Sequence, residues 1–485
     1  MQDENSSARA NVKDSCQILI LGSGPTGLGA AYRLNKIQFN DYVVIDKSDL
    51  PGGLSVTKKD AQGFLWDMGG HVLFSHYKEF DEMLDETLGD EWQWHVRESW
   101  VWMRDRFVPY PLQHNSHMLP KTESLGCARD LTVRKLLSST GGIWDHCPDK
   151  IKKLARPFFD LKKATDFENW LQSKFGQQLF ESFLKPYNEK VWAQPLSKMN
   201  SVWVGERVAL PNWESLLKGF LLGRSTETWG PNYQFRFPTF GGTGAIWQRL
   251  YESLPRDHFL FSKSILSVDA NKKLVRLSDS SELKYDKLIS TIALDDLLKL
   301  VAVGDRKIEG DRHVDLLYSS TSVLGIGLKG QPPAALKTKN WIYFPEEQFP
   351  FYRMTVFSNY SPYNVPLPGE HWSLLLEVAS SEHRPKPTEL MEKCVSSLEN
   401  VGWLHSQNIL SRAEYFLPKG YPTPFLERDN TLSEVQPWLE SLDIFSRGRF
   451  GGWKYEVSNQ DHSFMQGYEI ADRLVSGQAE KTYRI

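Results

Sequence analysis

The strongest constraint on the fold is a glycine-rich turn between an apolar segment and a small-residue helix near the start of the chain. Residues 18–21 are apolar and lead into Gly22-Ser23-Gly24-Pro25-Thr26-Gly27, a G-x-G-x-x-G fingerprint. Its first glycine permits a tight turn, the second lets a pyrophosphate approach the backbone, and the third lets the helix pack on the strand. A second apolar segment, 42–45, ends in Asp46, where a ribose-binding carboxylate is expected. Residues 16–75 are therefore predicted to form a β-α-β nucleotide-binding unit.

Two further Gly-Gly turns follow this unit, in Pro51-Gly52-Gly53-Leu54 and Asp67-Met68-Gly69-Gly70-His71. A nicotinamide-dependent dehydrogenase does not need them. An extended FAD molecule does, because more of the backbone must come close to it. The sequence therefore predicts FAD as the resident cofactor.

Composition narrows the class of partner. The net charge is −3 and no block of basic residues occurs, which argues against nucleic acid or an anionic membrane surface. No apolar run approaches the length of a membrane span, and the acidic N-terminus is unlike a signal peptide. The 17 Trp and 18 Tyr can fill cores, but they are also typical of sugar and nucleobase pockets.

The four cysteines, Cys16, Cys127, Cys147 and Cys394, are scattered. No pair has the spacing of a metal or redox motif, so a reducing, cytoplasmic location is predicted. We find neither a metal-ligand cluster nor a Ser-His-Asp arrangement, and no metal is expected.

The chain is long enough for two or three domains. We predict an α/β protein: a Rossmann-like FAD-binding domain, an inserted all-α domain and an antiparallel β-sheet substrate domain. The ranges are a disordered tail at 1–15, the FAD-binding domain at 16–110, 229–312 and 446–485, the mainly helical domain at 111–228 and the substrate sheet at 313–445. Within them, 76–95 is predicted as helix, 100–110 as a hairpin and 385–445 as a mixed segment.

Several motifs in the same order resemble the UDP-galactopyranose mutase family, in its longer eukaryotic form, from about residue 16 to about 478. They are Gly69-Gly70-His71-Val72-Leu73-Phe74-Ser75-His76, Pro109-Tyr110-Pro111-Leu112-Gln113, Pro186-Tyr187-Asn188-Glu189-Lys190-Val191-Trp192, Trp229-Gly230-Pro231-Asn232, Phe351-Tyr352-Arg353, Gly420-Tyr421-Pro422-Thr423-Pro424 and the segment from Arg447 to His462. The tail before residue 16 matches nothing in the family, and 365–371 is shorter than in some members.

The resemblance implies an isomerase that interconverts UDP-galactopyranose and UDP-galactofuranose for cell-surface glycans. In the family, N5 of reduced FAD attacks the anomeric carbon while UDP leaves, so the flavin acts as a nucleophile. NADPH is the implied reductant, although no second dinucleotide fingerprint occurs. The oligomeric state stays open.

The fingerprint and the resemblance together assign the site residues. The cofactor-binding set is Gly22, Gly24, Thr26, Gly27, Asp46, Lys47, Gly53, Leu54, Gly70, His71, Val268, Gly448, Asn459, Gln460 and Ser463. The substrate-binding set is Tyr110, Gln113, Asn188, Trp192, Arg207, Asn232, Tyr343, Arg353, Tyr360, Tyr421, Arg449 and Tyr455. His71, Arg353 and Arg449 are the catalytic candidates, since guanidinium groups suit a diphosphate and His71 is expected beside the flavin.

Each residue also has a purely structural interpretation: a surface ion pair for the arginines, and core packing for the tyrosines, Trp192 and His71. Two other functions share the scaffold. A flavin amine oxidase or desaturase would need an apolar tunnel and would consume oxygen. A non-catalytic relative, such as the prenyl-GTPase carriers, would have lost its FAD function.

Overall fold

The computed structural model describes residues 14–139, 166–205, 208, 210, 218–220, 233–304, 306–307 and 315–484. The tail, Cys147, Arg207 and Asn232 lie outside the described residues, so the predictions for them stay predictions. Among the described helices, none is both long and apolar enough to cross a membrane.

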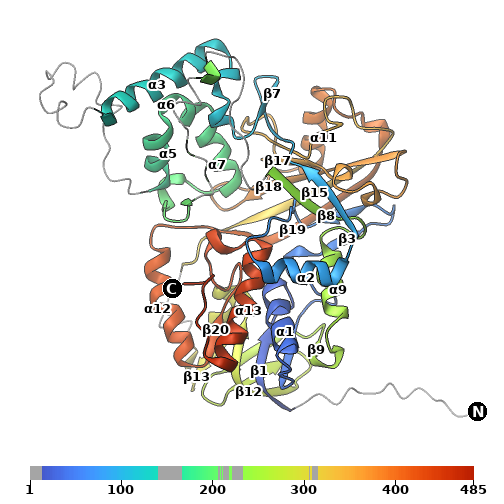
Figure 1. Cartoon of the computed structure of the whole chain (residues 1–485), viewed down its shortest axis with the longest axis vertical. Coiled ribbons are helices and arrows are strands. Elements are labelled where there is room, and N and C mark those ends of the chain that lie inside the picture. The colour runs from blue at the N-terminus through green and yellow to red at the C-terminus, as the bar shows by residue number, and fades with distance from the viewer. Residues whose placement is uncertain are drawn as a thin grey trace, which may run out of the picture.

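One half of the molecule, the lower half in Figure 1, is built on a nine-stranded sheet of order β14-β13-β10-β11-β12-β1-β2-β9, with β20 also paired to β12. Strands β1, β2, β9, β12 and β20 run parallel, whereas β10, β11 and β12 form an antiparallel meander. The strands are β1 (Ser15–Leu21), β2 (Tyr42–Ile45), β9 (Phe259–Leu260), β10 (Ile265–Asp269), β11 (Leu274–Leu277), β12 (Glu282–Ser290), β13 (Val301–Val303), β14 (Arg306–Lys307) and β20 (Ile444–Ser446). Parallel strands buried on both faces are what the apolar segments around the fingerprint predict.

Helix α1 (Pro25–Lys36) and the last long helix, α13 (Gln460–Ser476), pack side by side against this sheet. A Cβ on Gly467 would lie closer than 3.0 Å to the carbonyl oxygen of Thr26, so only glycine allows this approach. Farther along both helices, Arg33 and Asp472 form an ion pair at 2.6 Å. The helices thus run in the same direction, and both N-termini face the same side of the molecule.

The second sheet has seven strands in the order β19-β15-β18-β17-β16-β6-β7. These are β6 (Ser99–Met103), β7 (Arg106–Pro109), β15 (Tyr318–Lys329), β16 (Trp341–Tyr343), β17 (Arg353–Val356), β18 (His371–Ser380) and β19 (Ile409–Pro422). The predicted hairpin at 100–110 is present, but it joins this sheet rather than the nucleotide-binding one. The segment 385–445 contains β19, a strand of 14 residues that its prediction as mixed structure missed.

Helices of the inserted region form the upper left of Figure 1: α3 (Lys121–Ser139), α5 (Phe167–Phe175), α6 (Gln177–Leu179) and α7 (Lys185–Trp192). A π-helical turn, Phe180–Leu184, joins α6 to α7. Pro186 follows it in the first turn of α7, and a proline there has no N–H for the helical ladder. Helices are thus the main elements of the described part of this region, and the limits of the predicted helical domain stay a prediction.

The remaining elements cover the two sheets or connect them. They are β3 (Thr57–Lys59), β4 (Leu65–Asp67), α2 (Lys78–Leu88), β5 (Trp92–Val96), β8 (Gln234–Pro238), α9 (Gly244–Glu252), α10 (Leu294–Leu300), α11 (Leu390–Asn400) and α12 (Arg428–Ser441). The helix predicted over 76–95 is wrong at its end. α2 stops at Leu88, and residues 92–96 pair with β8 as a strand.

Candidate active site

The glycine turn is held against the end of β2 by hydrogen bonds. Gly22 has φ +97°, and its N–H donates to the carbonyl oxygen of Ile45 at 2.8 Å. The backbone N–H and the hydroxyl of Ser23 donate to the Asp46 carboxylate at 2.6 and 2.7 Å. The fingerprint therefore has the geometry that its sequence predicts, with Asp46 next to the turn.

The N-terminus of α1 opens onto a second glycine turn. Gly24 caps the helix without any side-chain hydrogen bond. A Cβ on Gly24 would meet nothing closer than the Cα of Gly53, at 3.8 Å. Two glycines facing a helix N-terminus without a side-chain cap leave room for an anion beside the first turn of the helix, which fits the pyrophosphate of FAD.

The C-terminal segment that contains the predicted Gly448 and Asn459 lies next to this turn. Gly448 has φ +89°, and its N–H donates to Gln466 of α13 at 2.8 Å. A Cβ on Gly448 would lie 2.5 Å from the hydroxyl oxygen of Thr26, so the segment touches the first turn of α1. Asn459 is the N-cap of α13, and its carbonyl oxygen accepts from the N–H of Ser463.

The other predicted cofactor residues are less specifically placed. Val268 is fully buried within β10, Lys47 is exposed and Leu54 is partly buried. The side-chain oxygen of Gln460 accepts from the indole N–H of Trp247 at 3.0 Å. Contacts of these four residues with FAD stay predictions.

The His71 loop follows β4 and packs against β17 and β18 of the second sheet. Gly69 has φ +135°, and the N–H of Gly70 donates to the Glu377 carboxylate at 3.0 Å. Burial lowers the pKa of His71 to about 4, with Arg353 acting in the same direction and Glu377 opposing it. The imidazole is therefore neutral at pH 7. Its buried Nδ1 has no hydrogen-bond partner among the described residues, which fits a side chain that meets a cofactor.

Arg353, at the start of β17, forms a two-pronged ion pair with Glu377. Its Nε and Nη2 donate to the two carboxylate oxygens at 2.6 and 2.8 Å. Tyr352 donates its hydroxyl to the same carboxylate at 2.9 Å. Burial alone would raise the pKa of Glu377, but Arg353 and these hydrogen bonds hold that pKa below its ordinary value. Both partners of the pair are therefore charged at neutral pH.

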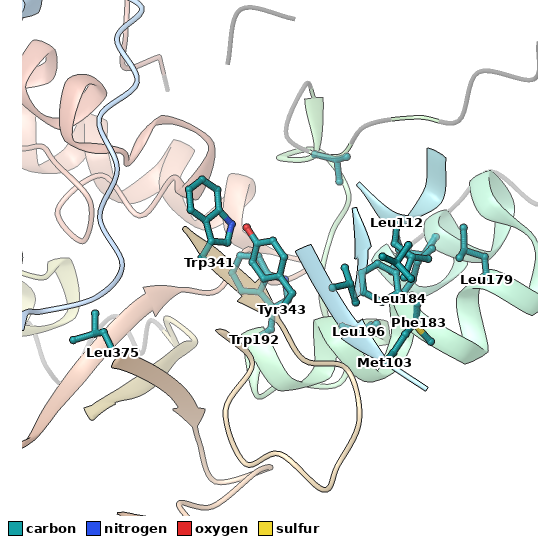
Figure 2. Close-up of a cluster of buried hydrophobic side chains, with 14 of the residues drawn as sticks. Met103, Leu112, Leu179, Phe183, Leu184, Trp192, Leu196, Trp341, Tyr343 and Leu375 are labelled. Atoms are coloured by element: carbon teal, nitrogen blue, oxygen red, sulfur yellow. The ribbon is translucent and has the colours of Figure 1, made fainter. Parts of the chain in front are cut away.

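An aromatic wall extends from Arg353 toward the helical region. The ring of Tyr343 lies 4.7 Å from that of Tyr110 and 5.3 Å from that of Tyr187. Trp192 packs edge-on against Tyr455 at 4.8 Å. Figure 2 shows Trp192, Trp341 and Tyr343 close together, between Leu375 and a group of mostly aliphatic side chains of the same core.

Arg449 fixes the far end of this wall. Its guanidinium donates to the carbonyl oxygen of Gly420 at 3.0 and 3.2 Å, and to Ser458. It also lies 4.8 Å from the centre of the Tyr421 ring. Burial raises the pKa of Tyr421, although Arg353 partly opposes this, so its hydroxyl remains a donor at neutral pH. Arg449 thus orients Tyr421 as well as being near the site.

Three predicted substrate residues are in less open positions. Tyr360 is 1% exposed and packs among Phe235 and Phe237. Gln113 is buried in the turn after β7. The side-chain amide of Asn188 donates to the carbonyl oxygen of Leu184 in its own helix. For these residues the structure gives packing roles, and their contacts with substrate stay predictions.

The sequence did not single out four residues of this cluster: Glu377, Tyr352, Tyr187 and Arg97. Arg97 lies over the rings of Trp341 and Tyr110, at 5.0 and 5.9 Å. Tyr187 and Tyr352 lie within the family motifs quoted above, so the sequence did contain a signal that could have identified them as site residues. Nothing local marks Glu377 or Arg97, because their positions depend on strand pairing across the chain.

Other parts of the described surface carry separate features. Two depressions, one beside α11 and one between Pro51 and α9, are not lined by any of the site's side chains. His76, Asp461 and His462 bring two imidazoles and a carboxylate together, a grouping that the sequence spacing did not reveal. Both imidazoles are hydrogen-bonded to that carboxylate, at 2.7 and 2.9 Å.

Comparison with known proteins first gives the class. A family model described as flavin containing amine oxidoreductase matches residues 25–412. Together with the glycine turns and the fold, this match defines an FAD-dependent protein of the amine-oxidoreductase class.

A crystal structure of reduced UDP-galactopyranose mutase is similar to this chain over nearly its whole length. It is 42% identical, with a TM-score of 0.87 and 96% of each chain covered. The chain therefore belongs to the UDP-galactopyranose mutase family of flavoenzymes, which confirms the resemblance seen in the motifs. A putative protoporphyrinogen oxidase from Exiguobacterium (16% identity, TM-score 0.68, 96% of this chain and 99% of that one) and a putrescine oxidase (14%, 0.62, 95% and 99%) share the fold alone.

Proposed function

We propose that the protein interconverts UDP-galactopyranose and UDP-galactofuranose, and that it does so only when its FAD is reduced. Reduced FAD, when bound, supplies the nucleophile N5 for the anomeric carbon of the sugar. The chain's own task is then to hold the nucleotide diphosphate, stabilise it as a leaving group and keep the sugar close to the flavin.

The observation that carries this proposal is the state of Arg353. Its side chain is 20% exposed, and Nη1 makes no hydrogen bond to any of the described residues. Arg428 and Arg447, two arginines buried elsewhere, use all three guanidinium nitrogens in bonds to neighbouring groups. An oriented guanidinium with one side unused suits an anionic ligand such as a diphosphate.

Neighbouring hydroxyl groups can add to this grip. Tyr421 and Tyr455 lie with their rings 5.9 Å apart, and Tyr343 stands beside Arg353 in the register of β16 and β17. Phenol O–H groups donate to phosphate oxygens without adding charge. Arg449 supplies a second positive charge near Tyr421. An amine oxidase would instead need an apolar passage, which these groups do not form.

His71 is proposed to stand beside the flavin as a neutral side chain. Because burial holds its pKa near 4, it adds no positive charge there at pH 7. It can accept or donate one hydrogen bond as the cofactor changes its oxidation state. Its catalytic part is therefore positioning and hydrogen bonding rather than proton abstraction.

The test uses purified protein reduced with dithionite under argon and incubated with UDP-galactofuranose. Chromatography should detect UDP-galactopyranose, with no net oxidation of flavin. The same protein with oxidised FAD is the matched control and should be inactive. Turnover by the oxidised form, or oxygen consumption with an amine, would contradict the proposal.

We further propose NADPH as the reductant and the cytoplasm as the location. Two of the described cysteines, Cys127 and Cys394, are free and buried, which agrees with a reducing compartment. Mixing NADPH with the oxidised protein under argon should bleach the flavin absorbance. An unchanged spectrum after NADPH, but bleaching by dithionite, would point to another reductant.

A further inference from the structure

One buried carboxylate, that of Glu377, touches both the His71 loop and Arg353. Glu377 lies on β18 directly opposite Arg353 of β17, and its side chain is 3% exposed. Oε1 accepts from Gly70 N–H and Arg353 Nε, while Oε2 accepts from Arg353 Nη2 and the Tyr352 hydroxyl. Four donors saturate an ionised carboxylate, so none of its bonds can move without affecting the others.

The contact between Glu377 and the His71 loop is tightly packed. A Cβ on Gly70 would lie 2.6 Å from the Thr355 hydroxyl, 3.1 Å from Glu377 Oε1 and 3.4 Å from Arg353 Nε. Only a glycine lets the backbone N–H come this close. The next residue is His71, so a displacement of that loop would stretch the bond from Gly70 to Glu377.

The contact with Arg353 decides which part of the guanidinium is presented. Glu377 occupies the edge formed by Nε and Nη2, and Nη1 is left without a hydrogen bond among the described residues. Without the carboxylate, the long arginine side chain could rotate among several rotamers and would lose entropy on meeting an anion.

We propose that Glu377 is a positioning residue that couples the His71 loop to Arg353 and so sets the orientation in which Arg353 meets the diphosphate. The inference rests on the proposed function for the identity of the ligand. The alternative role for Glu377 makes the opposite prediction: if Glu377 only neutralised Arg353, removing the carboxylate charge would strengthen the binding of an anion.

The experiment compares UDP binding to FAD-replete wild type, Glu377→Gln and Glu377→Asp, followed by flavin absorbance. Gln removes the charge and turns one acceptor into a donor. Asp keeps the charge but withdraws the carboxylate by about 1.5 Å, one carbon–carbon bond. Both variants should bind UDP at least about tenfold more weakly, because neither can hold the arginine and Gly70 together. Tighter or unchanged binding by Glu377→Gln, or wild-type binding by Glu377→Asp, would overturn the proposal.

A matched control comes from a second buried pair with the same geometry. Glu480 accepts from Arg447 Nε and Nη2 at 2.6 and 2.8 Å, away from the aromatic wall. Glu480→Gln should destabilise the fold without weakening UDP binding in the FAD-replete protein. If Glu377→Gln does not fold, Glu377→Asp alone decides the matter, since it retains the ion pair's charges.

The coupling itself is tested by Gly70→Ala, alone and combined with Glu377→Gln. Each single change should weaken UDP binding, and the double variant should be no weaker than the worse single one, because both act through one carboxylate. Losses that multiply in the double variant would show that the loop and Arg353 act independently. UDP binding is measured without turnover, so it remains decisive even if UDP-galactofuranose is not isomerised and the proposed reaction is wrong.

Discussion

The glycine fingerprint allows a test that separates packing from cofactor binding, because two of its glycines have different surroundings. A Cβ on Gly27 would lie closer than 3.0 Å to the carbonyl oxygen of Gly22, so alanine there must push α1 away from β1. A Cβ on Gly24 would meet nothing in the protein closer than 3.8 Å, and its φ of −73° suits any residue. Gly24→Ala should therefore fold normally and affect only what binds over it.

The expected magnitudes follow from these contacts. Alanine in place of glycine at an N-cap costs about 0.5–1 kcal/mol, and the lower entropy of the unfolded chain returns a similar amount. The apoprotein of Gly24→Ala should therefore stay within about 1 kcal/mol of wild type. A methyl group forced against a pyrophosphate costs about 1–3 kcal/mol, which weakens FAD binding roughly 5- to 150-fold.

The assay titrates FAD-free protein with FAD and follows the quenching of flavin fluorescence, while urea unfolding reports the stability of the apoprotein. Gly27→Ala should lose both stability and FAD. Gly24→Ala should lose FAD affinity alone. The same FAD affinity in Gly24→Ala and wild type would mean that the pyrophosphate does not approach Gly24, and the assignment of the glycine turn to the pyrophosphate would be wrong.

The remaining predictions concern three ionisable side chains, those of Arg353, His71 and Lys190. Arg353→Ala leaves Glu377 buried without its partner and should cost about 3–5 kcal/mol of stability, measured by urea unfolding. Arg353→Lys should keep FAD yet lower kcat/KM with UDP-galactofuranose roughly tenfold or more, and near wild-type kinetics would remove Arg353 from the site. An unfolded chain protonates His71 below about pH 6.5, but the folded one only near pH 4, so stability should fall by about 3 kcal/mol as the pH drops through that window. His71→Asn should flatten this dependence in urea titrations, and an unchanged slope would contradict the low pKa of His71 in the folded protein. Lys190 donates to three carbonyl oxygens after β16, so Lys190→Met should lower the free energy of unfolding by about 3 kcal/mol or more. The control is Lys185→Met on the same helix, which removes a partly exposed ion pair and should lower it by under about 1 kcal/mol in the same assay. Equal losses in the two variants would refute this prediction.

Local sequence rules predicted the nucleotide-binding half well, since its signals are short-range. The first apolar strand, the glycine turn with its helix, and the second apolar strand each depend on neighbouring residues only. Glycine, turn residues and apolar periodicity act over a few positions, which is why such elements can be identified from one sequence.

The secondary-structure predictions were wrong where two sequence patterns adjoin, or where a strand pairs with a strand far away in the sequence. The period-2 alternation of Trp92-Gln93-Trp94-His95-Val96 directly follows an amphipathic helix, and the helical prediction was extended over it. β19 alternates buried and exposed residues over most of its length, but charged and proline residues interrupt its apolar pattern. Tertiary pairing stabilises both strands, and no propensity within either one predicts it.

The same limit applies to the candidate site, and it identifies what holds the site in place. On β17 and β18, Met354 and Leu376 belong to a buried hydrophobic cluster on one face of the sheet. Alternation then puts Arg353 and Glu377 on the opposite face, directly across from each other. A slip of one residue would expose the apolar set and bury the charges, which is strongly unfavourable. The apolar face therefore fixes the register, and the register brings the arginine to its carboxylate. The motif around Arg353 could point to an anion-binding arginine, but its partner follows only from the packing of the other face.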